Sequence, residues 1–341
     1  MSDSRNTRIL LARRPSGEPT DADFEIESQP IPPLADGEIL IKILWLSLDP
    51  YMRGRMSDRK SYAPPTELGQ PIVGEAAGVV AKSRSDRWNE GDHVCARSGW
   101  QSYFVAKGDD PSVYGVDAKA SPLSTYLGVL GMPGRTAYFG LLRIGKPRVG
   151  ETVVVSAAAG AVGSAVGQIA KIRGCRAVGV AGGEAKCRHV VDEFGFDACV
   201  DYKAGNLDAD LAAACPDGID VYFENVGGAV ARAVAPLLNE GARVPICGFI
   251  SAYNAEDMAK EETPFDVLGA LANPPEHRFF LVFDFFENFD EANAQLAEWL
   301  EQGKLKYRES VAEGIENAAA AFRGLLRGTN FGKQLVAVAK E

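Results

Sequence analysis

The sequence predicts an α/β protein in which a β-rich part precedes a doubly wound, mostly parallel sheet covered by helices. Up to about residue 125, short runs of apolar and β-branched residues are separated by glycine and proline. From about Leu130 onward, strand-like and helix-like segments alternate. The clearest of these segments, residues 153–170, passes from a β-branched strand through a glycine-containing turn into a helix of small residues. These observations together predict two domains.

The elements follow one another in a regular order. In the β-rich part, the pattern predicts strands at residues 38–44, 74–80 and 92–96. In the alternating part, it predicts strands at residues 153–156, 176–180, near 200, at 220–224, 243–247 and 279–283. A helix through residues 292–300, a strand near Tyr307 and a helix through residues 315–326 come next. The final run, residues 334–338, could return to the first domain.

The turn after the strand at 153–156 has the spacing of a dinucleotide-binding turn. Gly160 and Gly163 stand in the second and third places of G-x-G-x-x-G, and Ala158 stands in the first. Backbone N–H groups at the start of the following helix could therefore approach two phosphates without obstruction by side chains. The expected pyrophosphate contacts are Ala159, Gly160, Ala161, Val162 and Gly163. On the turn alone, an ordinary tight strand-to-helix connection remains the alternative.

The next strand indicates which dinucleotide is bound. An NAD site usually has an acidic residue here that binds the ribose 2′-hydroxyl, but this strand ends in Ala181-Gly182-Gly183. Glu184 follows one residue later, and Lys186 and Arg188 come after it. Cations beside a glycine turn suit the 2′-phosphate of NADP. The sequence therefore favours NADP(H), with a solvated helix face as the alternative for the two cations.

Length and composition support a two-domain enzyme. A chain of 341 residues exceeds what one core usually organises, and 46% hydrophobic residues can fill two cores. The net charge of −10 argues against nucleic acid and anionic membranes as partners. The polar stretch at residues 1–6 lacks the apolar region of a secretion signal, so a cytoplasmic location is expected.

Cysteine and histidine are too scattered to predict a metal site. The three histidines, His93, His189 and His277, form no H-E-x-x-H pattern. The six cysteines form no C-x-x-C pair, so they are expected to be reduced and mostly buried; they are Cys95, Cys175, Cys187, Cys199, Cys215 and Cys247.

Several segments in order resemble one known family over nearly the whole chain. They are residues 46–56 (LSLDPYMRGRM), 61–65 (SYAPP), 127–134 (LGVLGMPG), 224–228 (ENVGG) and 251–254 (SAYN). The sequence is identified on these segments as a zinc-independent medium-chain dehydrogenase/reductase of the leukotriene-hydroxydehydrogenase, prostaglandin-reductase and curcumin-reductase group. Zinc-using members carry a Gly-His-Glu motif where this chain reads Val73-Gly74-Glu75, so the histidine ligand is missing.

The resemblance implies the fold and the assembly. It implies a GroES-like domain at residues 1–128 and 307–341 and a Rossmann nucleotide-binding domain at residues 129–306. A substrate pocket is expected between the two domains. A homodimer is expected through edge-to-edge pairing of the nucleotide-domain sheets along residues 279–283.

The resemblance also implies NADPH-dependent reduction of the carbon-carbon double bond of α,β-unsaturated ketones and aldehydes, such as dienones, alkenones and alkenals. Hydride adds to the β-carbon and negative charge accumulates on the carbonyl oxygen, so the site needs donors aimed at that oxygen. Tyrosine hydroxyls are suitable donors. Tyr253 is the first candidate, Tyr62 is the second, and Tyr51 is expected to line the pocket. A tyrosine at a domain boundary with its hydroxyl in water is the alternative for each.

The same resemblance assigns the remaining cofactor contacts. Lys186 and Tyr202 look like the groups that meet the 2′-phosphate, next to Gly182, and Asn225 is expected at the ribose and diphosphate. Asn330 looks like an asparagine that reaches the cofactor. The segments expected to border the nicotinamide contain Cys247, Gly248, Phe249 and Tyr253, and Phe280, Leu281 and Val282. Cys247 lacks a neighbouring histidine, so we interpret it as a buried packing group.

Three alternatives remain open at this stage. The phenylalanines from Phe279 to Phe286 could form the floor of a pocket for an aromatic enone, or they could belong to the core or to a dimer contact. The same cofactor geometry could deliver hydride to a quinone. Cofactor motifs alone are also compatible with a non-catalytic NADPH-binding scaffold or sensor.

Overall fold

The computed structural model describes residues 5–59, 61–257 and 260–340. Its backbone contacts divide the chain into two units. Unit 1 comprises Met1–Gly128, Glu309–Asn330 and Gln334–Glu341, and unit 2 comprises Val129–Arg308 and Phe331–Lys333. The short segment 331–333 belongs to unit 2 because Gly332 N donates to Ala159 O (3.0 Å) and Lys333 N donates to Arg308 O (2.8 Å). The domain boundary predicted at residue 307 assigns residues 307–308 and this segment to the other domain, and that boundary stays a prediction.

Unit 1 is built around strands. β1 (Arg5–Leu11) and β2 (Phe24–Pro30) form an antiparallel pair. A larger sheet has the order β14-β15-β3-β4-β5-β7, and β6 also pairs with β3. From β15 to β7 its neighbouring strands are antiparallel. Its strands are β3 (Glu38–Ser47), β4 (Ala76–Ser83), β5 (His93–Ala96), β6 (Tyr103–Lys107), β7 (Tyr114–Gly115), β14 (Glu309–Glu313) and β15 (Lys333–Ala337). The predicted return of residues 334–338 to this unit is confirmed, because β15 pairs with β3.

Alternation of side chains along β3 creates the core of unit 1. Ile39, Ile41 and Ile43 are all fully buried, as expected for one face of a strand. Trp100 lies in the same core, with its ring 5.5 Å from that of Phe322 in an edge-to-face contact. The helices of this unit are short: η1 (Asp21–Asp23), α1 (Tyr51–Arg55), η2 (Leu123–Leu127), η8 (Ile315–Asn317) and α9 (Ala318–Leu326).

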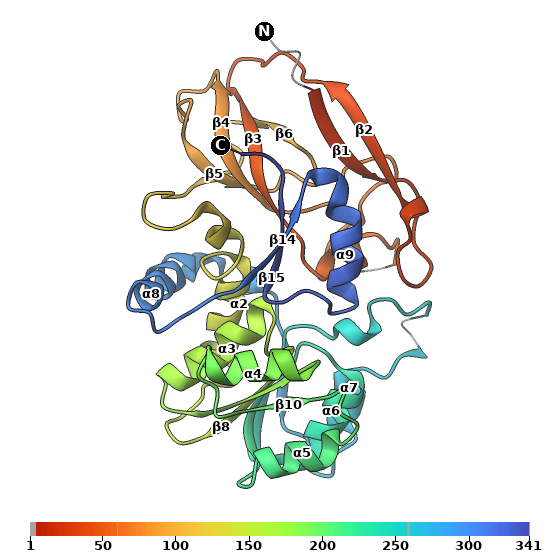
Figure 1. The fold of residues 1–341 in the computed structure, drawn as a ribbon, viewed down its shortest axis with the longest axis vertical. Coiled ribbons are helices and arrows are strands. Elements are labelled where there is room, and N and C mark those ends of the chain that lie inside the picture. The colour runs from red at the N-terminus through yellow and green to blue at the C-terminus, as the bar shows by residue number, and fades with distance from the viewer. Residues whose placement is uncertain (1–4, 60, 258–259, 341) are drawn as a thin grey trace. The chain divides into compact units, whose positions relative to one another are not determined.

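Unit 2 contains the predicted parallel sheet, with the strand order β10-β9-β8-β11-β12-β13 (Figure 1). The strands are β8 (Thr152–Ser156), β9 (Arg176–Ala181), β10 (Ala198–Asp201), β11 (Ile219–Phe223), β12 (Leu238–Ile246) and β13 (Glu276–Phe279). Every neighbouring pair is parallel. The order moves outward from β8 to β10 and then resumes on the other side of β8 with β11, so the direction of winding reverses beside β8. That reversal is where doubly wound sheets bind ligands.

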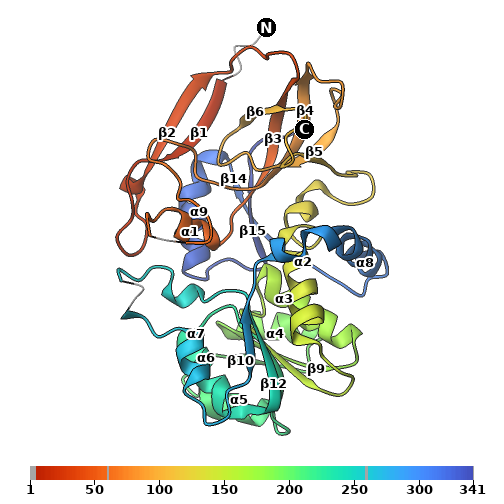
Figure 2. The ribbon, with the colours of Figure 1, turned by 180° about the vertical axis from the view of Figure 1, so that it is seen from behind.

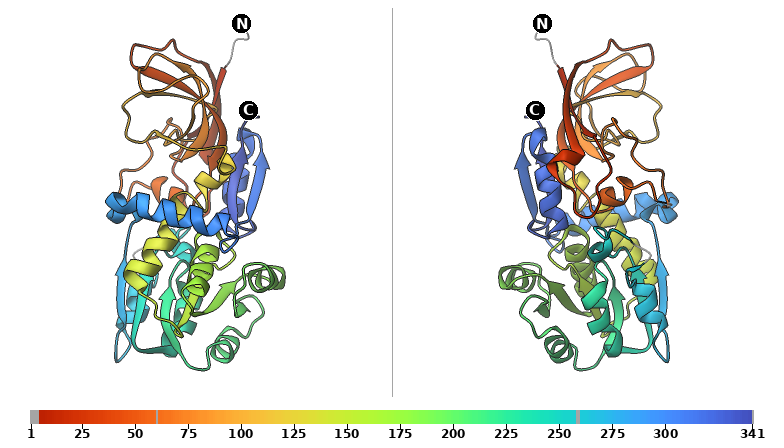
Figure 3. Two further views of the ribbon diagram at one scale, coloured as in Figure 1. Left: turned by 90° about the vertical axis from the view of Figure 1, so that its left-hand side faces the viewer. Right: turned by 90° about the vertical axis from the view of Figure 1, so that its right-hand side faces the viewer.

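Helices cover both faces of this sheet. The two opposed views of Figure 3 show α2 and α3, in yellow to lime, over one face, and α6 and α7, in teal to cyan, over the other. The helices are α2 (Met132–Phe139), η3 (Gly140–Gly145), α3 (Ala161–Ile172), α4 (Glu184–Asp192), α5 (Leu207–Ala214), α6 (Gly228–Val234), η4 (Ala235–Leu237), η5 (Ile250–Ala252), α7 (Pro264–Gly269), η7 (Val282–Asn288) and α8 (Phe289–Glu301). Within the described ranges, every helix is too short or too polar to span a bilayer.

The glycines of α3 let it pack closely against neighbouring segments. A Cβ built on Gly163 would lie 2.3 Å from Ala157 O, and one built on Gly167 would lie 1.8 Å from Cζ of Phe196. Both distances are far below van der Waals contact, so only glycine fits without rearrangement. The apolar positions Ala165, Val166 and Ile169 are buried on the same helix.

The predicted strand at residues 279–283 is wrong after its first residue, Phe279. β13 ends at Phe279, and residues from Val282 form the 3₁₀ helix η7. Asp284 starts this helix, because its carboxylate accepts from Leu281 N (3.2 Å) while its own N–H donates to Leu281 O (3.0 Å). The run of phenylalanines therefore passes from a strand into a helix near Phe280. In Figure 2 this segment lies between the labelled elements β12 and α8.

Candidate active site

The six parallel strands bring most of the predicted cofactor residues to one edge of the sheet. In a parallel sheet all carboxyl ends lie at the same edge, and open α/β sheets bind ligands there. The predicted residues from Ala159 to Gly163, Gly182 with Lys186, Tyr202, Asn225, the segment from Cys247 to Tyr253, and Phe280 to Val282 each follow one of these carboxyl ends. Only Asn330, Tyr51 and Tyr62 come from other parts of the chain.

The turn between β8 and α3 leaves several N–H groups without a helical partner. The first helical bond runs from Ser164 N to Gly160 O (3.0 Å), so the N–H groups of Ala161, Val162 and Gly163 precede the hydrogen-bond ladder. Ala157, with φ at 53°, takes a left-handed conformation that begins the turn. N–H groups in this position, at the positive end of a helix dipole, are suited to bind an anion.

Two lysines and a tyrosine lie beside Gly182. A Cβ on Gly182 would lie 2.9 Å from the Tyr202 hydroxyl and 3.0 Å from Cε of Lys203. The Lys203 ammonium lies 5.7 Å from the centre of the Tyr202 ring. Burial, followed by the positive charge of Lys203, lowers the pKa of Lys186. Lysines that repel one another in this way form a site that an anionic group would stabilise.

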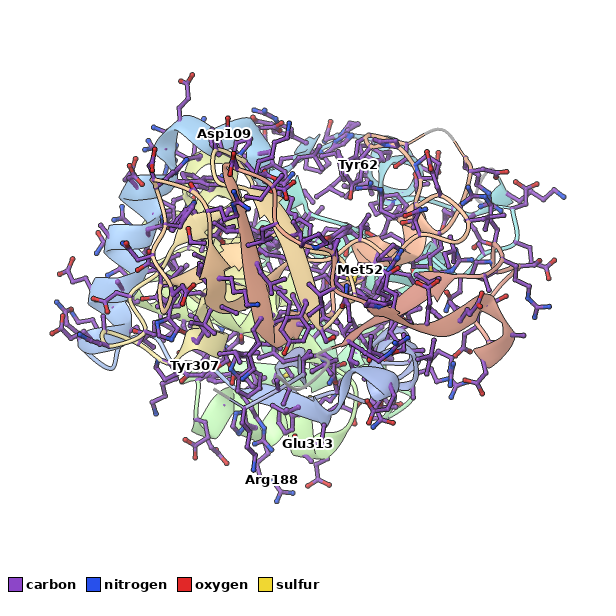
Figure 4. All side chains as sticks on the ribbon, turned by 90° about the horizontal axis from the view of Figure 1, so that it is seen from above. Met52, Tyr62, Asp109, Arg188, Tyr307 and Glu313 are labelled. Carbon is purple, nitrogen blue, oxygen red and sulfur yellow. The ribbon has the colours of Figure 1, made fainter. Side chains whose placement is uncertain are left out.

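Lys203, which the sequence interpretation did not include, lies beside Gly182, whereas Arg188 is paired on its own helix. Arg188 pairs with Glu184 one turn earlier on α4, and its side chain is 65% exposed, at the outer edge of the molecule in Figure 4. It therefore matches the alternative of a solvated helix face. Lys203 follows β10 directly after Tyr202, and its position after the carboxyl end of a strand was the signal that could have identified it.

Asn225 is held at the end of β11 by Ser156, the last residue of β8. Its backbone N–H donates to Ser156 Oγ (2.8 Å), and its side-chain Nδ2 donates to Ser156 O (2.8 Å). The Asn225 side-chain oxygen is thereby oriented as an acceptor. Its neighbour Glu224 is fully buried.

The segment after β12 carries Tyr253 back toward the carboxyl edge. A Cβ on Gly248 would lie 2.6 Å from the Tyr253 hydroxyl, so this hydroxyl lies against the backbone of Gly248. The rings of Tyr253 and Phe249 make an edge-to-face contact with centroids 5.9 Å apart. Burial raises the pKa of Cys247 to about 12, so its thiol stays protonated at neutral pH. This agrees with a packing role for Cys247.

The phenylalanine run divides into core and surface. Phe280 is 2% exposed, and its ring lies 2.4 Å from a Cβ built on Gly140. Phe280 can therefore reach a ligand only through its backbone, with Leu281 half-buried and Val282 buried beside it. Phe279, Phe283 and Phe286 are instead exposed.

Tyr51 and Tyr62 belong to unit 1. Tyr51 opens α1, and Tyr62 lies in the loop that follows, where it is labelled in Figure 4. Burial raises the pKa of Tyr51, and the neighbouring charges of Asp49 and Glu75 raise it further. Tyr51 is therefore a protonated donor at all physiological pH values, whereas Tyr62 is 53% exposed.

Asn330 is half-buried and immediately precedes the 331–333 segment, in which Gly332 N donates to Ala159 O.

Comparison with known proteins identifies the family. Two family models match, one described as the N-terminal domain of oxidoreductase at residues 7–113 and one described as zinc-binding dehydrogenase at residues 161–274. The chain is 46% identical to the NADPH-dependent curcumin reductase of Escherichia coli (strain K12), over 98% of this chain and 97% of that protein. It is 38% identical to a 2-alkenal reductase (NADP(+)-dependent) of Nicotiana tabacum, over 98% of each. The chain belongs to the medium-chain dehydrogenase/reductase family.

A solved member of the family is similar over the whole fold. The crystal structure of CurA from Vibrio vulnificus in complex with NADPH superimposes with a TM-score of 0.93 and 47% identity, over 99% of this chain and 100% of that one. The expected fold class is thereby confirmed, with a β-rich unit and a Rossmann-like parallel sheet.

In this chain, apolar side chains fill the space at Gly74, the position at which zinc-using members of the family carry a histidine ligand. A Cβ on Gly74 would already lie 3.1 Å from the Trp100 indole and 3.2 Å from the methyl group of Met52. Both side chains are fully buried, so a histidine does not fit at residue 74 without displacing them. In the described ranges, no three His, Cys, Asp or Glu side chains are grouped so that they could hold a metal ion.

The residues of unit 2 fit an NADP-type dinucleotide. The N–H groups at the start of α3 suit a diphosphate. Lys186, Lys203 and the Tyr202 hydroxyl converge beside Gly182, where a 2′-phosphate would neutralise the two ammonium groups. No carboxylate ends β9, so the feature typical of an NAD site is absent.

Proposed function

We propose that this protein is an NADPH-dependent reductase of the carbon-carbon double bond in α,β-unsaturated ketones and aldehydes. The observation that carries the proposal is the placement of the Tyr253 hydroxyl against Gly248, on a segment that is hydrogen-bonded to the Asn225–Gly228 turn. A donor thus lies at the same sheet edge as the anion sites that suit the cofactor. The curcumin and 2-alkenal reductases to which the chain is similar support the same class of substrate.

Different residues of the chain contact the substrate and the cofactor. NADPH supplies the hydride that adds to the β-carbon of the enone. As negative charge develops on the carbonyl oxygen, the Tyr253 hydroxyl donates a hydrogen bond to it and stabilises the transition state. The enolate then takes a proton at its α-carbon, which comes from a tyrosine hydroxyl or from water and gives the saturated ketone or aldehyde. Lys186, Lys203 and Tyr202 hold the 2′-phosphate, while the N–H groups that begin α3 hold the diphosphate. Asn225 offers its side-chain oxygen to a ribose hydroxyl.

Tyr62 and Tyr51 complete the proposal as groups that contact the substrate. Tyr62 is the second candidate donor, because it is 53% exposed and a tyrosine near solvent can be reprotonated from water. Tyr51 contributes an apolar ring and a hydroxyl that stays protonated. We propose Asn330 as a further cofactor contact, on the support of its position immediately before Phe331-Gly332. Independence of zinc and a cytoplasmic location stay predictions.

The decisive experiment measures oxidation of NADPH and of NADH with a dienone, a medium-chain alkenone, a 2-alkenal and a quinone, and identifies each product by mass. We expect saturated ketone or aldehyde, with NADPH preferred over NADH. Tyr253→Phe should lower kcat about 100-fold with little change in the KM for NADPH, because it removes one donor to the developing oxyanion. Tyr126→Phe is the control, since the Tyr126 hydroxyl donates to Asp117 O (2.9 Å).

The other outcomes favour different functions. Turnover of the quinone alone would replace enone reduction by quinone reduction, and the tyrosine variants would then have little effect. Tight NADPH binding without turnover of any compound would indicate the scaffold or sensor. Full activity of Tyr253→Phe would remove Tyr253 from the mechanism.

We also propose that the protein forms a homodimer through the free edge of the unit 2 sheet. β13 is the last strand in the sheet order, so one of its edges has no strand partner among the described residues. Phe279 (38% exposed), Phe283 (46%) and Phe286 (65%) lie on or just after this strand. The strand itself is mostly polar (Glu-His-Arg-Phe), so the support comes from its unpaired edge and from the exposed phenylalanines beside it, which a second copy would cover.

A further inference from the structure

Glu224 is a buried carboxyl group at the junction of two strand ends. It follows the last residue of β11 and is 0% exposed. Its Oε1 accepts from Val226 N (2.7 Å), from Gly227 N (2.9 Å) and from Ser156 Oγ (3.0 Å). Since Ser156 ends β8, one oxygen atom links the end of β8 to the turn after β11.

The backbone of Glu224 reaches a third strand. Its N–H donates to Pro245 O (3.0 Å), and its carbonyl accepts from Cys247 N (2.9 Å) and Gly248 N (3.3 Å). The segment that begins after β12 is therefore anchored on the same residue. Glu224 is thus hydrogen-bonded at the start of three loops at the carboxyl edge, those after β8, β11 and β12.

The hydrogen bonds continue from Glu224 to the proposed functional residues. Ser156 Oγ, which donates to Glu224, accepts from Asn225 N (2.8 Å). Asn225 O accepts from Ile250 N (3.1 Å), and Val226 O accepts from Ser251 N (3.0 Å). Tyr253 lies two residues beyond this last bond, so its segment is tied to the turn that Glu224 holds.

Packing alone does not account for a carboxyl at this position. Burying a carboxyl costs free energy, and an apolar side chain of similar size would fill the space without that cost. Burial raises the pKa of Glu224, while the Gly227 and Val226 N–H groups act in the opposite direction. In either protonation state the group retains an oxygen that can accept from these N–H groups.

We infer that Glu224 is a positioning residue for the cofactor: its side chain fixes the ends of β8 and β11 so that the glycine turn and Asn225 are set to bind NADPH. The inference rests on the proposed function. It adds that the affinity for NADPH depends on a side chain that does not itself touch the dinucleotide.

Asp220 provides a matched control at the opposite end of the same strand. It lies on β11, and its Oδ2 accepts from Thr152 N (2.8 Å), the first residue of β8. Its Oδ1 accepts from Asn239 Nδ2 (2.9 Å). Asp220 thus joins β8 and β11 as Glu224 does, but at their amino ends.

The test measures the dissociation constant of NADPH by its fluorescence, together with Tm, kcat and KM, for Glu224→Ala, Glu224→Gln and Asp220→Ala. We expect Glu224→Ala to weaken NADPH binding about tenfold, because two N–H groups and one hydroxyl lose their acceptor. Glu224→Gln should restore the affinity to within about twofold, since its amide oxygen still accepts. Asp220→Ala should lower Tm but leave the NADPH affinity unchanged.

Two results would overturn the inference. One is NADPH affinity in Glu224→Ala equal to that of the unmodified protein. The other is an equal loss of affinity in Asp220→Ala, which would reveal a general effect of destabilising β8 and β11. If Glu224→Ala does not fold, Ser156→Ala is tested in its place. That variant removes one donor to Glu224 and the acceptor of Asn225 N. Unchanged NADPH affinity in Ser156→Ala would overturn the inference.

The affinity measurement is independent of turnover. Absence of enone reduction with NADPH binding intact would contradict the proposed function while leaving the inference to be decided by these dissociation constants. Failure of the unmodified protein to bind NADPH would overturn both.

Discussion

Lys186 and Lys203, the two lysines proposed to bind the 2′-phosphate, lie on different elements. Lys186 is on α4 and Lys203 follows β10, yet the charge of Lys203 contributes to the lowered pKa of Lys186. Burial contributes more, which disfavours the charged form of Lys186 in the absence of an anion. A phosphate between the two ammonium groups would reverse this effect, because opposite charges favour the ionised lysines.

This arrangement predicts a cofactor-specific effect of substitution. Lys203→Met should weaken NADPH binding about tenfold and leave NADH binding unchanged, because only NADPH carries the 2′-phosphate. Equilibrium titration with both nucleotides checks this, and added salt should weaken NADPH binding more in the unmodified protein than in the variant. Arg188→Met is the control on the neighbouring helix, where Arg188 already pairs with Glu184. Equal losses for NADPH and NADH would contradict the role of Lys203.

The sequence and the structure supply different observations about Tyr253. The motif and the resemblance selected this tyrosine, and the structure adds that its hydroxyl lies against Gly248. That proximity depends on the η5 turn, in which Ala252 N and Tyr253 N donate to Phe249 O and Ile250 O. The role of Tyr253 in the reaction stays a prediction for the Tyr253→Phe experiment.

The packing of α3 is decided by glycine on one side and an aromatic ring on the other. Phe196 follows α4 and is 3% exposed, and its ring occupies the space that a side chain at residue 167 would need. The sequence predicted a helix of small residues after the glycine turn. It did not identify Phe196 as the contact, because that pairing connects separate elements.

Asp197 connects the end of α3 to the start of β9. Its carboxylate accepts from Lys171 Nζ (2.8 and 2.9 Å) and from Ala177 N (2.7 Å). Burial opposes the charged form, but the bonds to Lys171 and Ala177 outweigh it and hold the pKa of Asp197 below its ordinary value of 3.8. A carboxylate with a lowered pKa stabilises the fold above its ordinary pKa, and this stability is lost as pH falls through the lowered value.

The pH dependence of stability checks this connection. Asp197→Asn should lower Tm by about 2 °C at pH 7, because the pair with Lys171 is partly exposed and screened by water. The difference between variant and unmodified protein should shrink as pH falls below 3.8, where the unmodified side chain also becomes neutral. Asp109→Asn, at an exposed loop position labelled in Figure 4, is the control with the same charge change. A Tm difference that stays constant down to the lowest pH would contradict the ion pair's contribution.

The segment from Phe279 to Phe286 illustrates a limit of local patterns. Its apolar composition favoured a strand, but Asp284 and the burial of Phe280 against Gly140 end the strand and start η7. The same residues then separate into one core aromatic and several exposed ones. Composition alone does not distinguish these environments, because burial depends on what another element places opposite each ring.

The proposed dimer makes a prediction about the assembly. Phe283→Asp should shift the protein from two chains to one, because a charge at an apolar contact cannot be desolvated without cost. Sedimentation or light scattering measures the mass. Ile26→Asp is the control, since Ile26 on β2 is 56% exposed and also exchanges an apolar side chain for a charge. A single-chain mass for the unmodified protein, or an unchanged dimer in Phe283→Asp, would contradict this interface.

The order of the six parallel strands brings most of the candidate site residues to one edge of the sheet. The sequence predicted the individual strands and the turn at 157–163 because these follow from neighbouring residues, through side-chain periodicity and the steric freedom of glycine. It also predicted, through resemblance, the family and the cofactor class. The reversal of winding beside β8, which brings the loops after β8 and β11 together, is a relation between distant segments.

The contacts that refine the site are of the same long-range kind. Lys203 beside Gly182, the hydrogen bonds of Glu224 to the ends of two strands, and the apolar packing at Gly74 each join residues from separate elements. Local sequence specifies which segments become strands, helices and turns, because those preferences act over a few residues. Which side chains then meet depends on the pairing order and close packing of the folded chain, and no pattern along the chain encodes those distances directly.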